Sequence, residues 1–158
     1  MIELVQVFFD VSLRDWCRRP YPGHPKGCPN YGERPTCPPE APLLGDVLNL
    51  LRPVWAVWVE FDLEAQRKRM WLTHPKWSKR QAECCRYWQG GVRKRLRAEL
   101  LFHQIALEET GLVDIEVPEA MGVNVTETMR GIGVDLEWPV EKIDRHVGLI
   151  GYRKETSK

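Results

Sequence analysis

The residues best suited to chemistry are three cysteines in the first quarter of the chain, Cys17, Cys28 and Cys37. Their spacing, C-x10-C-x8-C, is more open than the close ligand pairs of zinc fingers and differs from the tight cysteine run of ferredoxins. Two of the three are followed by proline, as is the last cysteine of the bacterial ferredoxin pattern. Thiolates are soft ligands, so this set favours an iron–sulfur cluster or zinc.

The segment that carries these cysteines has an unusual composition. Between Arg18 and Pro42 it contains eight prolines and three glycines, and almost no aliphatic residue. Prolines remove backbone donors and fix φ, so neither a helix nor a strand is expected to run through it. A loop of this length in a compact domain needs something to order it. We therefore predict a metal-binding loop over residues 16–42, in which metal bonds replace a hydrophobic core.

The kind of metal site stays open at this point. We favour a 4Fe–4S cluster, with zinc held by the three cysteines and His24 as the alternative. Three free thiols in a surface loop are less favoured, because exposed unpaired thiols are readily oxidised. Three cysteines leave one iron of a cubane cluster without a thiolate. Cys84, Cys85, His24 or an exogenous ligand would fill that place, and an open iron would be a catalytic feature.

Cys84 and Cys85 fall in an expected long helix. Cys85 shares an apolar stripe with Ala82, Val92 and Leu96, which predicts a core residue. Cys84 points about 100° away from it, near Trp88, so it is slightly favoured as the fourth ligand. Two buried cysteines without a metal role are the alternative.

Four cations, Lys79, Arg86, Arg93 and Arg97, recur at seven, seven and four residues and so share one face of that expected helix. Such a face would suit RNA or another phosphorylated ligand. Neighbouring rings would offer stacking surfaces, namely Trp71, Trp77, Tyr87 and Trp88. The simpler interpretation is a solvated helix face balanced by nearby acids.

Two stretches of the chain resemble a known family. The run GCPNYGERPTCPPEAP resembles the N-terminal signature, C-P-x-Y-G followed by C-P-P, of a prokaryotic family described as predicted metal-binding proteins of unknown function. The stretches EAMGVNVTETMRGIGVDLEWP and HVGLIGY are similar to its C-terminal part, where a helix leads to a final strand. The resemblance implies Cys17, Cys28 and Cys37 as ligands. The family tends to carry further cysteines before the Gly-Val-Asn segment, and this chain has none after Cys85.

Hydrophobic patterning predicts an α+β fold: a small, mainly antiparallel sheet with helices on one face, in a single domain over 1–158. The expected strands are 2–9, 55–61, 113–117, 134–138 and 147–152, the last two forming a hairpin. The expected helices are 43–51, 63–72 behind an Asp62 N-cap, 78–110 with a Ser78–Gln81 capping box and a kink at Gly90-Gly91, and 123–130.

Composition limits the function classes. The chain is 43% hydrophobic and 28% charged with a net charge of +1, so it can bury a core and its overall charge predicts no partner. It lacks an apolar run of membrane-spanning length, and the opening MIELVQVFFD does not read as a signal peptide. An odd count of five cysteines favours reduced thiols and a cytoplasmic protein without membrane contact.

Two functions therefore remain. The first is an iron–sulfur protein in redox or sulfur chemistry, working with a redox partner protein. The alternative is a zinc-stapled nucleic-acid-binding module without catalytic activity. No nucleophile-elbow, P-loop or dinucleotide motif is present, and no catalytic residue is assigned.

Overall fold

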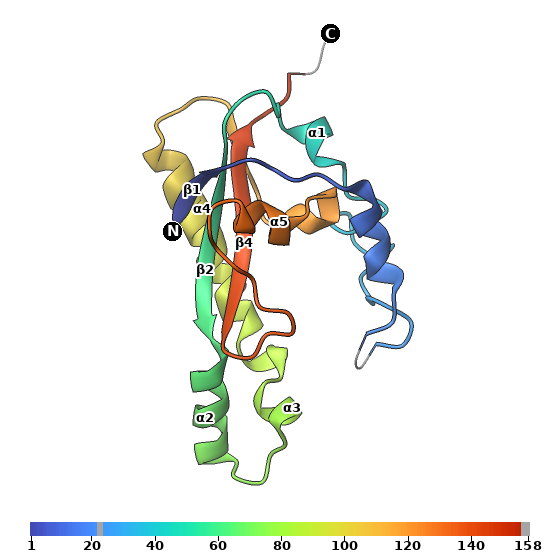
Figure 1. Cartoon of the computed structure of the whole chain (residues 1–158), viewed down its shortest axis with the longest axis vertical. Coiled ribbons are helices and arrows are strands. Elements are labelled where there is room, and N and C mark those ends of the chain that lie inside the picture. The colour runs from blue at the N-terminus through green and yellow to red at the C-terminus, as the bar shows by residue number, and fades with distance from the viewer. Residues whose placement is uncertain (22–23, 156–158) are drawn as a thin grey trace.

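The computed structural model describes residues 1–21 and 24–155. It contains a four-stranded sheet in which every neighbouring pair is antiparallel, in the order β1-β2-β4-β3 (Figure 1). The strands are β1 (Ile2–Val5), β2 (Val54–Asp62), β3 (Leu112–Ile115) and β4 (Ile143–Tyr152). The predicted α+β class with a small antiparallel sheet is confirmed.

The central pair of strands forms the base of the core. Val54 of β2 lies opposite Gly151 of β4, and the pairing continues to Asp62 opposite Ile143. The β2 sequence VWAVWVEFD is apolar at consecutive positions, which is the pattern of a strand covered on both faces. Both faces of the sheet therefore need a covering layer.

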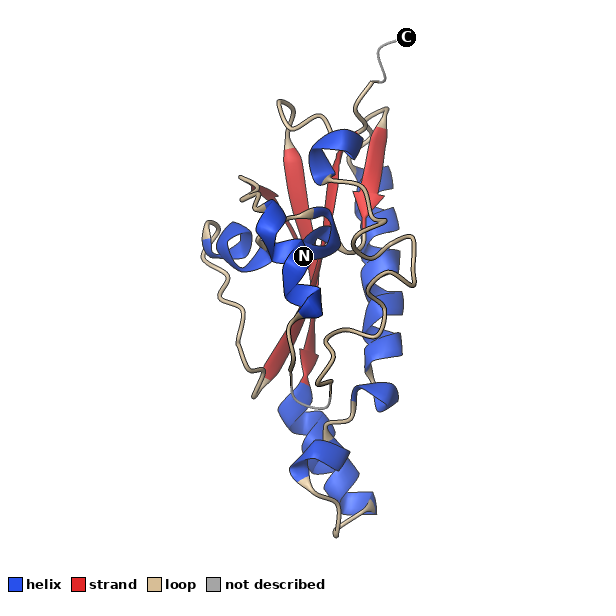
Figure 2. Cartoon of the chain, turned by 90° about the vertical axis from the view of Figure 1, so that its right-hand side faces the viewer, coloured by secondary structure: helices blue, strands red, loops and turns tan. Residues whose placement is uncertain are grey.

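One face is covered by the long helix α4 (Gln89–Ala106) (Figures 1 and 2). Its buried side chains recur every four residues and pack on β2 and β4, in a cluster that includes Val57, Val59, Val92, Leu96, Leu100 and Ile150. Gly148 is required beneath this helix, because a Cβ there would lie 2.9 Å from a Leu100 methyl.

The opposite face is covered by short elements: α1 (Leu44–Val47), α5 (Val125–Arg130) and the 3-10 helix η3 (Pro118–Met121) (Figure 2). Another 3-10 helix, η1 (Val11–Arg18), packs on η3 and has no buried side chain. Leu44, Met121 and Met129 enter a core cluster with Ala56 and Leu149 of the sheet. Helices thus cover both faces of the sheet rather than the one face that was predicted. The reason is that β2 and β4 direct apolar side chains to both faces.

A projection leaves this body at the end of β2. Helix α2 (Leu63–Thr73) follows β2 directly, and α3 (Lys79–Ala82) returns beside it, at the lower end of Figure 1. The Asp62 N-cap is confirmed, since its carboxylate accepts a hydrogen bond from the Ala65 N–H at 2.7 Å. We call α2, α3 and the following 3-10 helix η2 (Cys85–Tyr87), residues 63–88, the arm.

The prediction of one helix over 78–110 is wrong, although its capping box at Ser78 and Gln81 forms. The chain breaks into α3, η2 and α4, and Gly90-Gly91 lie in the first turn of α4 instead of at a kink. The Trp88 indole stacks on Phe61 and donates a hydrogen bond to the Glu83 carbonyl at 3.0 Å. This bond satisfies a carbonyl that a continuous helix would use, so the helix ends there.

The predicted strand over 134–138 and its hairpin are also wrong: β4 pairs with β2 and β3, and residues 134–138 form no strand. The Glu137 carboxylate instead accepts the backbone N–H groups of Glu141 and Lys142 at 3.1 and 2.9 Å, which forms a turn. The helix predicted over 43–51 shortens to α1, and the first strand ends at Val5. None of the helices within 1–21 and 24–155 combines the length and apolar character needed to span a bilayer.

Candidate metal centre

Cys17 lies near the end of η1, which begins where the Asp10 carboxylate accepts the Ser12 N–H at 2.9 Å. The side chain of Cys17 is half-buried. Because η1 packs on η3 at the side of the sheet body, Cys17 is held on a folded element rather than in free loop.

Cys28 lies directly beside Cys17. The Cys28 N–H donates to the Cys17 carbonyl at 2.7 Å. The preceding Gly27 is buried, has a φ of +84°, and a Cβ at this position would lie 2.6 Å from the Cys17 carbonyl oxygen. Only glycine allows this close approach of two backbone segments. Gly27 therefore sets the contact that brings Cys28 to Cys17.

Cys37 is positioned by a series of turns. Its N–H donates to the Arg34 carbonyl at 3.0 Å, and its carbonyl accepts from the Ala41 N–H at 2.9 Å. Arg14 of η1 donates to the carbonyl of Pro39 at 2.8 Å and to that of Ala41. The guanidinium thus ties the far end of the loop to the helix that carries Cys17.

The charges of the other two loop thiols act on Cys17. Burial raises the pKa of Cys17, and the charges of Cys28 and Cys37 raise it further. Glu119 of η3 adds a smaller effect in the same direction on the Cys17 pKa. Within residues 1–21 and 24–155, no group of three or more His, Cys, Asp or Glu side chains is placed to hold a metal ion together. The described side chains therefore do not form a finished ligand cage.

Tyr21 links this cluster to η2. Burial raises the pKa of its hydroxyl first, followed by the charges of Cys28 and Cys17, a hydrogen bond with Cys28, and the charge of Cys85. Cys85 itself is exposed on η2. Its prediction as a core residue is wrong: it is exposed, because the break in the helix moves it off the apolar stripe of α4.

The other two candidates for a fourth ligand lie differently. Cys84 is half-buried and lines a hollow on the arm with Trp77 and Tyr87. His24 is exposed and forms an isolated bridge with Tyr21, whose ring lies 4.6 Å from the imidazole. Residues 22 and 23 of the predicted metal-binding loop lie outside the described residues.

A polar pair on β4 was not found from the sequence. His146 and Asp144 alternate on β4, and their Nε2 and Oδ2 atoms lie 2.8 Å apart. His146 lies opposite Val59 of β2, and its ring packs edge-on against Trp88, so the pair points to the face of the sheet that α4 covers. The sequence signal that could have found the pair was their spacing of two residues in a strand, which places both side chains on one face.

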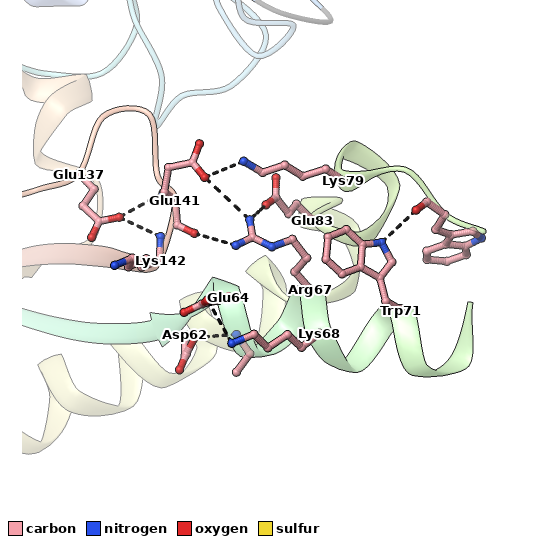
Figure 3. Close-up of polar contacts among 12 residues, drawn as sticks. Asp62, Glu64, Arg67, Lys68, Trp71, Lys79, Glu83, Glu137, Glu141 and Lys142 are labelled. Atoms are coloured by element: carbon pink, nitrogen blue, oxygen red, sulfur yellow. Dashed lines mark hydrogen bonds and ion pairs between the residues drawn. The ribbon is translucent and has the colours of Figure 1, made fainter. Parts of the chain in front are cut away.

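The four predicted basic residues do not share a helix face, because they lie on α3, η2 and α4 separately. Lys79 pairs with Glu141 at 2.6 Å (Figure 3), and Arg97 pairs with Glu116 at 2.8 Å. Arg86 and Arg93 are exposed on different elements. The stripe predicted from a continuous helix is thus divided, and two of its members are neutralised.

Comparison with protein-family models, curated proteins and solved structures found no match for this chain. The resemblance to the family of predicted metal-binding proteins accordingly depends on the cysteine segment and the C-terminal motif alone. The C-terminal motif forms η3, α5 and β4, and the cysteine segment follows η1. Both stretches therefore contribute to one side of the molecule, through Cys17 and Glu119.

Proposed function

We propose that this chain is a metal-binding protein in which Cys17, Cys28 and Cys37 hold an iron–sulfur cluster, most favourably of the 4Fe–4S type. The observation that carries the proposal is the backbone contact in which the Cys28 N–H donates to the Cys17 carbonyl at 2.7 Å, because it brings two of the three cysteines together. The resemblance of the cysteine segment to a family of predicted metal-binding proteins supports the same ligand set.

The residues present suit such a group. The donors are half-buried thiols, and soft sulfur ligands favour iron–sulfur clusters or zinc. Their neighbouring charges raise the Cys17 pKa, and a bound cation would remove that repulsion. When bound, a cluster would supply electron transfer or an open iron for sulfur chemistry. The chain itself contributes the backbone contact at Gly27 and the Arg14 bonds that fix the ligands.

For the fourth position we favour Cys85 over Cys84. Cys85 is exposed, and its charge, like those of Cys28 and Cys17, raises the pKa of the Tyr21 hydroxyl. Cys84 turns toward the arm and lines a hollow there. If Cys85 does not ligate, the fourth iron is open to an exogenous ligand or substrate. Free thiols and a redox partner protein suit a location in the reducing cytoplasm.

The test is anaerobic reconstitution with ferrous iron and sulfide, followed by metal and sulfide analysis and an absorption spectrum. We expect a broad shoulder near roughly 400 nm, which is lost in Cys17→Ser, Cys28→Ser and Cys37→Ser. The Cys85→Ser variant should assemble a less stable cluster. Cys84→Ser is the matched control, since it changes the adjacent thiol and should leave the spectrum intact.

Other results would decide against the cluster. A colourless protein with one zinc per chain would indicate the zinc staple instead. Loss of the shoulder in Cys84→Ser but not in Cys85→Ser would reverse the choice of fourth ligand. Stoichiometric metal in all three loop variants would overturn the proposed ligand set.

A further inference from the structure

The arm carries an unusual charge for this chain. Residues 63–88 contain only two acids, Glu64 and Glu83, whereas the whole chain is nearly balanced at a net charge of +1. The same residues contain seven cations: Arg67, Lys68, Arg69, Lys76, Lys79, Arg80 and Arg86. The excess positive charge is therefore concentrated on one projecting element (Figure 1).

The base of the arm neutralises part of this charge. Arg67 pairs with Glu83 and, at 3.9 Å, with Glu141 (Figure 3). Lys79 pairs with Glu141, and Lys68 pairs with Glu64 at 3.1 Å. Both acids of the arm are thus already engaged. These contacts fix the arm to the 137–142 turn. They leave the other cations of the arm without a free acidic partner on the arm.

Three further cations of the arm are exposed, namely Lys76, Arg80 and Arg86. Across the part of the chain that the structure describes, no ion pair involves any of them. Lys76 lies in the α2–α3 turn, Arg80 on α3 and Arg86 on η2, and all three side chains are exposed, so their charges are available to a ligand in solution.

Aromatic rings lie among these cations. The Trp77 indole stacks on the His74 imidazole with ring centres 3.9 Å apart, and on the Tyr87 ring at 5.6 Å. The Trp71 indole N–H donates to the Trp77 carbonyl at 2.9 Å, which holds the turn in place (Figure 3). His74 is exposed, and 56% of Tyr87 is exposed to solvent. The outer rings of this stack are therefore accessible to a further planar group.

Trp77 also forms a wall of two open hollows. One of about 250 Å³ is lined by Trp77, Arg80, Gln81, Cys84 and Tyr87. The other, of about 320 Å³, is lined by Thr73, His74, Pro75, Lys76 and Trp77. Each hollow combines stacked rings with one exposed cation, and neither contains a carboxylate.

We propose that the arm binds single-stranded nucleic acid, with bases stacking on His74 and Tyr87 at the two ends of the ring stack and phosphates held by Lys76, Arg80 and Arg86. Rings for bases and cations for the backbone are the two components of sequence-tolerant single-strand binding. An acidic peptide would satisfy the cations but would not use the rings. The site uses none of the proposed metal ligands, although Cys85 directly precedes Arg86 in η2, and it does not depend on a bound metal.

The test is fluorescence anisotropy at low salt with the full chain and labelled 12-nucleotide oligo-U and oligo-dT, beside a DNA duplex and a polyglutamate peptide. We expect at least one single strand to bind more tightly than duplex or peptide, with affinity that falls steeply as salt is raised. Comparison of oligo-U with oligo-dT shows whether RNA or DNA is preferred.

Variants separate stacking from charge. Tyr87→Ala should weaken single-strand binding about tenfold, as expected for loss of one stacked base. Arg80→Gln should weaken binding and lower the slope of the salt dependence by about one. Arg93→Gln is the matched control, because it removes an exposed cation from α4, outside the arm, and should change little.

Two further measurements complete the design. Cys17→Ser should bind the oligonucleotide as the unmodified chain does, so failure of the metal centre would not be mistaken for failure of the arm. Circular dichroism checks that Tyr87→Ala remains folded, and Tyr87→Phe should retain binding. Equal losses in Arg93→Gln and Arg80→Gln, equal binding of polyglutamate, or no binding of either single strand would overturn the proposal.

Discussion

The sheet body and the cysteine loop are ordered by different means. The body buries aliphatic side chains in two clusters, one on each face of the sheet, and residues such as Leu100 and Leu149 have no exposed surface. The described residues 24–42 of the loop bury only Gly27, Pro38 and Ala41. The loop is instead held by backbone hydrogen bonds and by Arg14. The hydrophobic effect therefore stabilises the body, while the loop depends on few polar contacts and, as we propose, on metal bonds.

The largest effect should follow from a cavity in the body. Leu149→Ala removes a fully buried side chain from the face that carries α1 and α5. We expect the free energy of unfolding to fall by about 2–5 kcal/mol, measured by urea denaturation with tryptophan fluorescence. Leu51→Ala, at a side chain that is 98% exposed, is the control and should change it by less than about 0.5 kcal/mol. Equal losses in both variants would show that the body does not depend on this core.

Gly27→Ala should damage the loop while sparing the body. The left-handed backbone costs a non-glycine residue about 1–3 kcal/mol, and the new Cβ would also meet the Cys17 carbonyl at 2.6 Å. We expect poor cluster assembly together with a nearly normal urea transition. Gly32→Ala is the control, since Gly32 has a φ of +72° but no atom near its added Cβ. Similar metal loading in the two variants would argue against the Gly27 contact as the element that joins Cys28 to Cys17.

Metal removal should loosen the loop alone. Lys26 is an exposed trypsin site within it, next to the buried Gly27. We expect cleavage after Lys26 to become several-fold faster when a chelator strips the reconstituted protein, because local opening no longer breaks metal bonds. Mass spectrometry identifies the cleavage site, and tryptophan fluorescence reports on the body. A cleavage rate that does not respond to the chelator would contradict a metal-ordered loop.

The smallest expected effect is the loss of stability at low pH where the arm joins the body. Lys79, through a hydrogen bond and its charge, lowers the pKa of Glu141, and backbone N–H groups of Lys142 and Glu141 lower the pKa of Glu137. A carboxyl whose pKa is lower in the folded state stabilises that state above its ordinary pKa of 4.5, and the contribution is lost as pH falls through the lowered value. Salt screens these exposed pairs, so the effect is slight.

The measurement is an acid titration that is monitored through the fluorescence of the tryptophans of the arm. The unmodified chain should show a transition below pH 4.5 that is reduced in Glu141→Gln. Glu155→Gln is the control, as a change to an exposed glutamate at the end of the described chain. A transition above that pH, or one of equal size in Glu141→Gln, would exclude Glu141 as its source.

The sequence by itself determined the features that depend on close neighbours along the chain. The apolar run of β2, the Asp62 cap of α2, the Ser78–Gln81 capping box and the irregular Pro-rich loop were all predicted and are confirmed. Each depends on backbone rules that act over a few residues, such as a cap oxygen accepting a nearby N–H or a proline that cannot donate. The proposal of Cys17, Cys28 and Cys37 as metal ligands also came from the sequence, through composition, spacing and the resemblance to a known family.

Only the tertiary structure decided where the helix over 78–110 breaks, because Trp88 stacks on Phe61, a partner distant in sequence, while its indole bonds to Glu83. That break exposes Cys85 and divides the basic stripe. The packing of η1, which carries Cys17, on η3 likewise joins segments that are distant in sequence. Periodicity assumes that an element continues unchanged, whereas packing between distant segments decides where it stops and what its side chains meet.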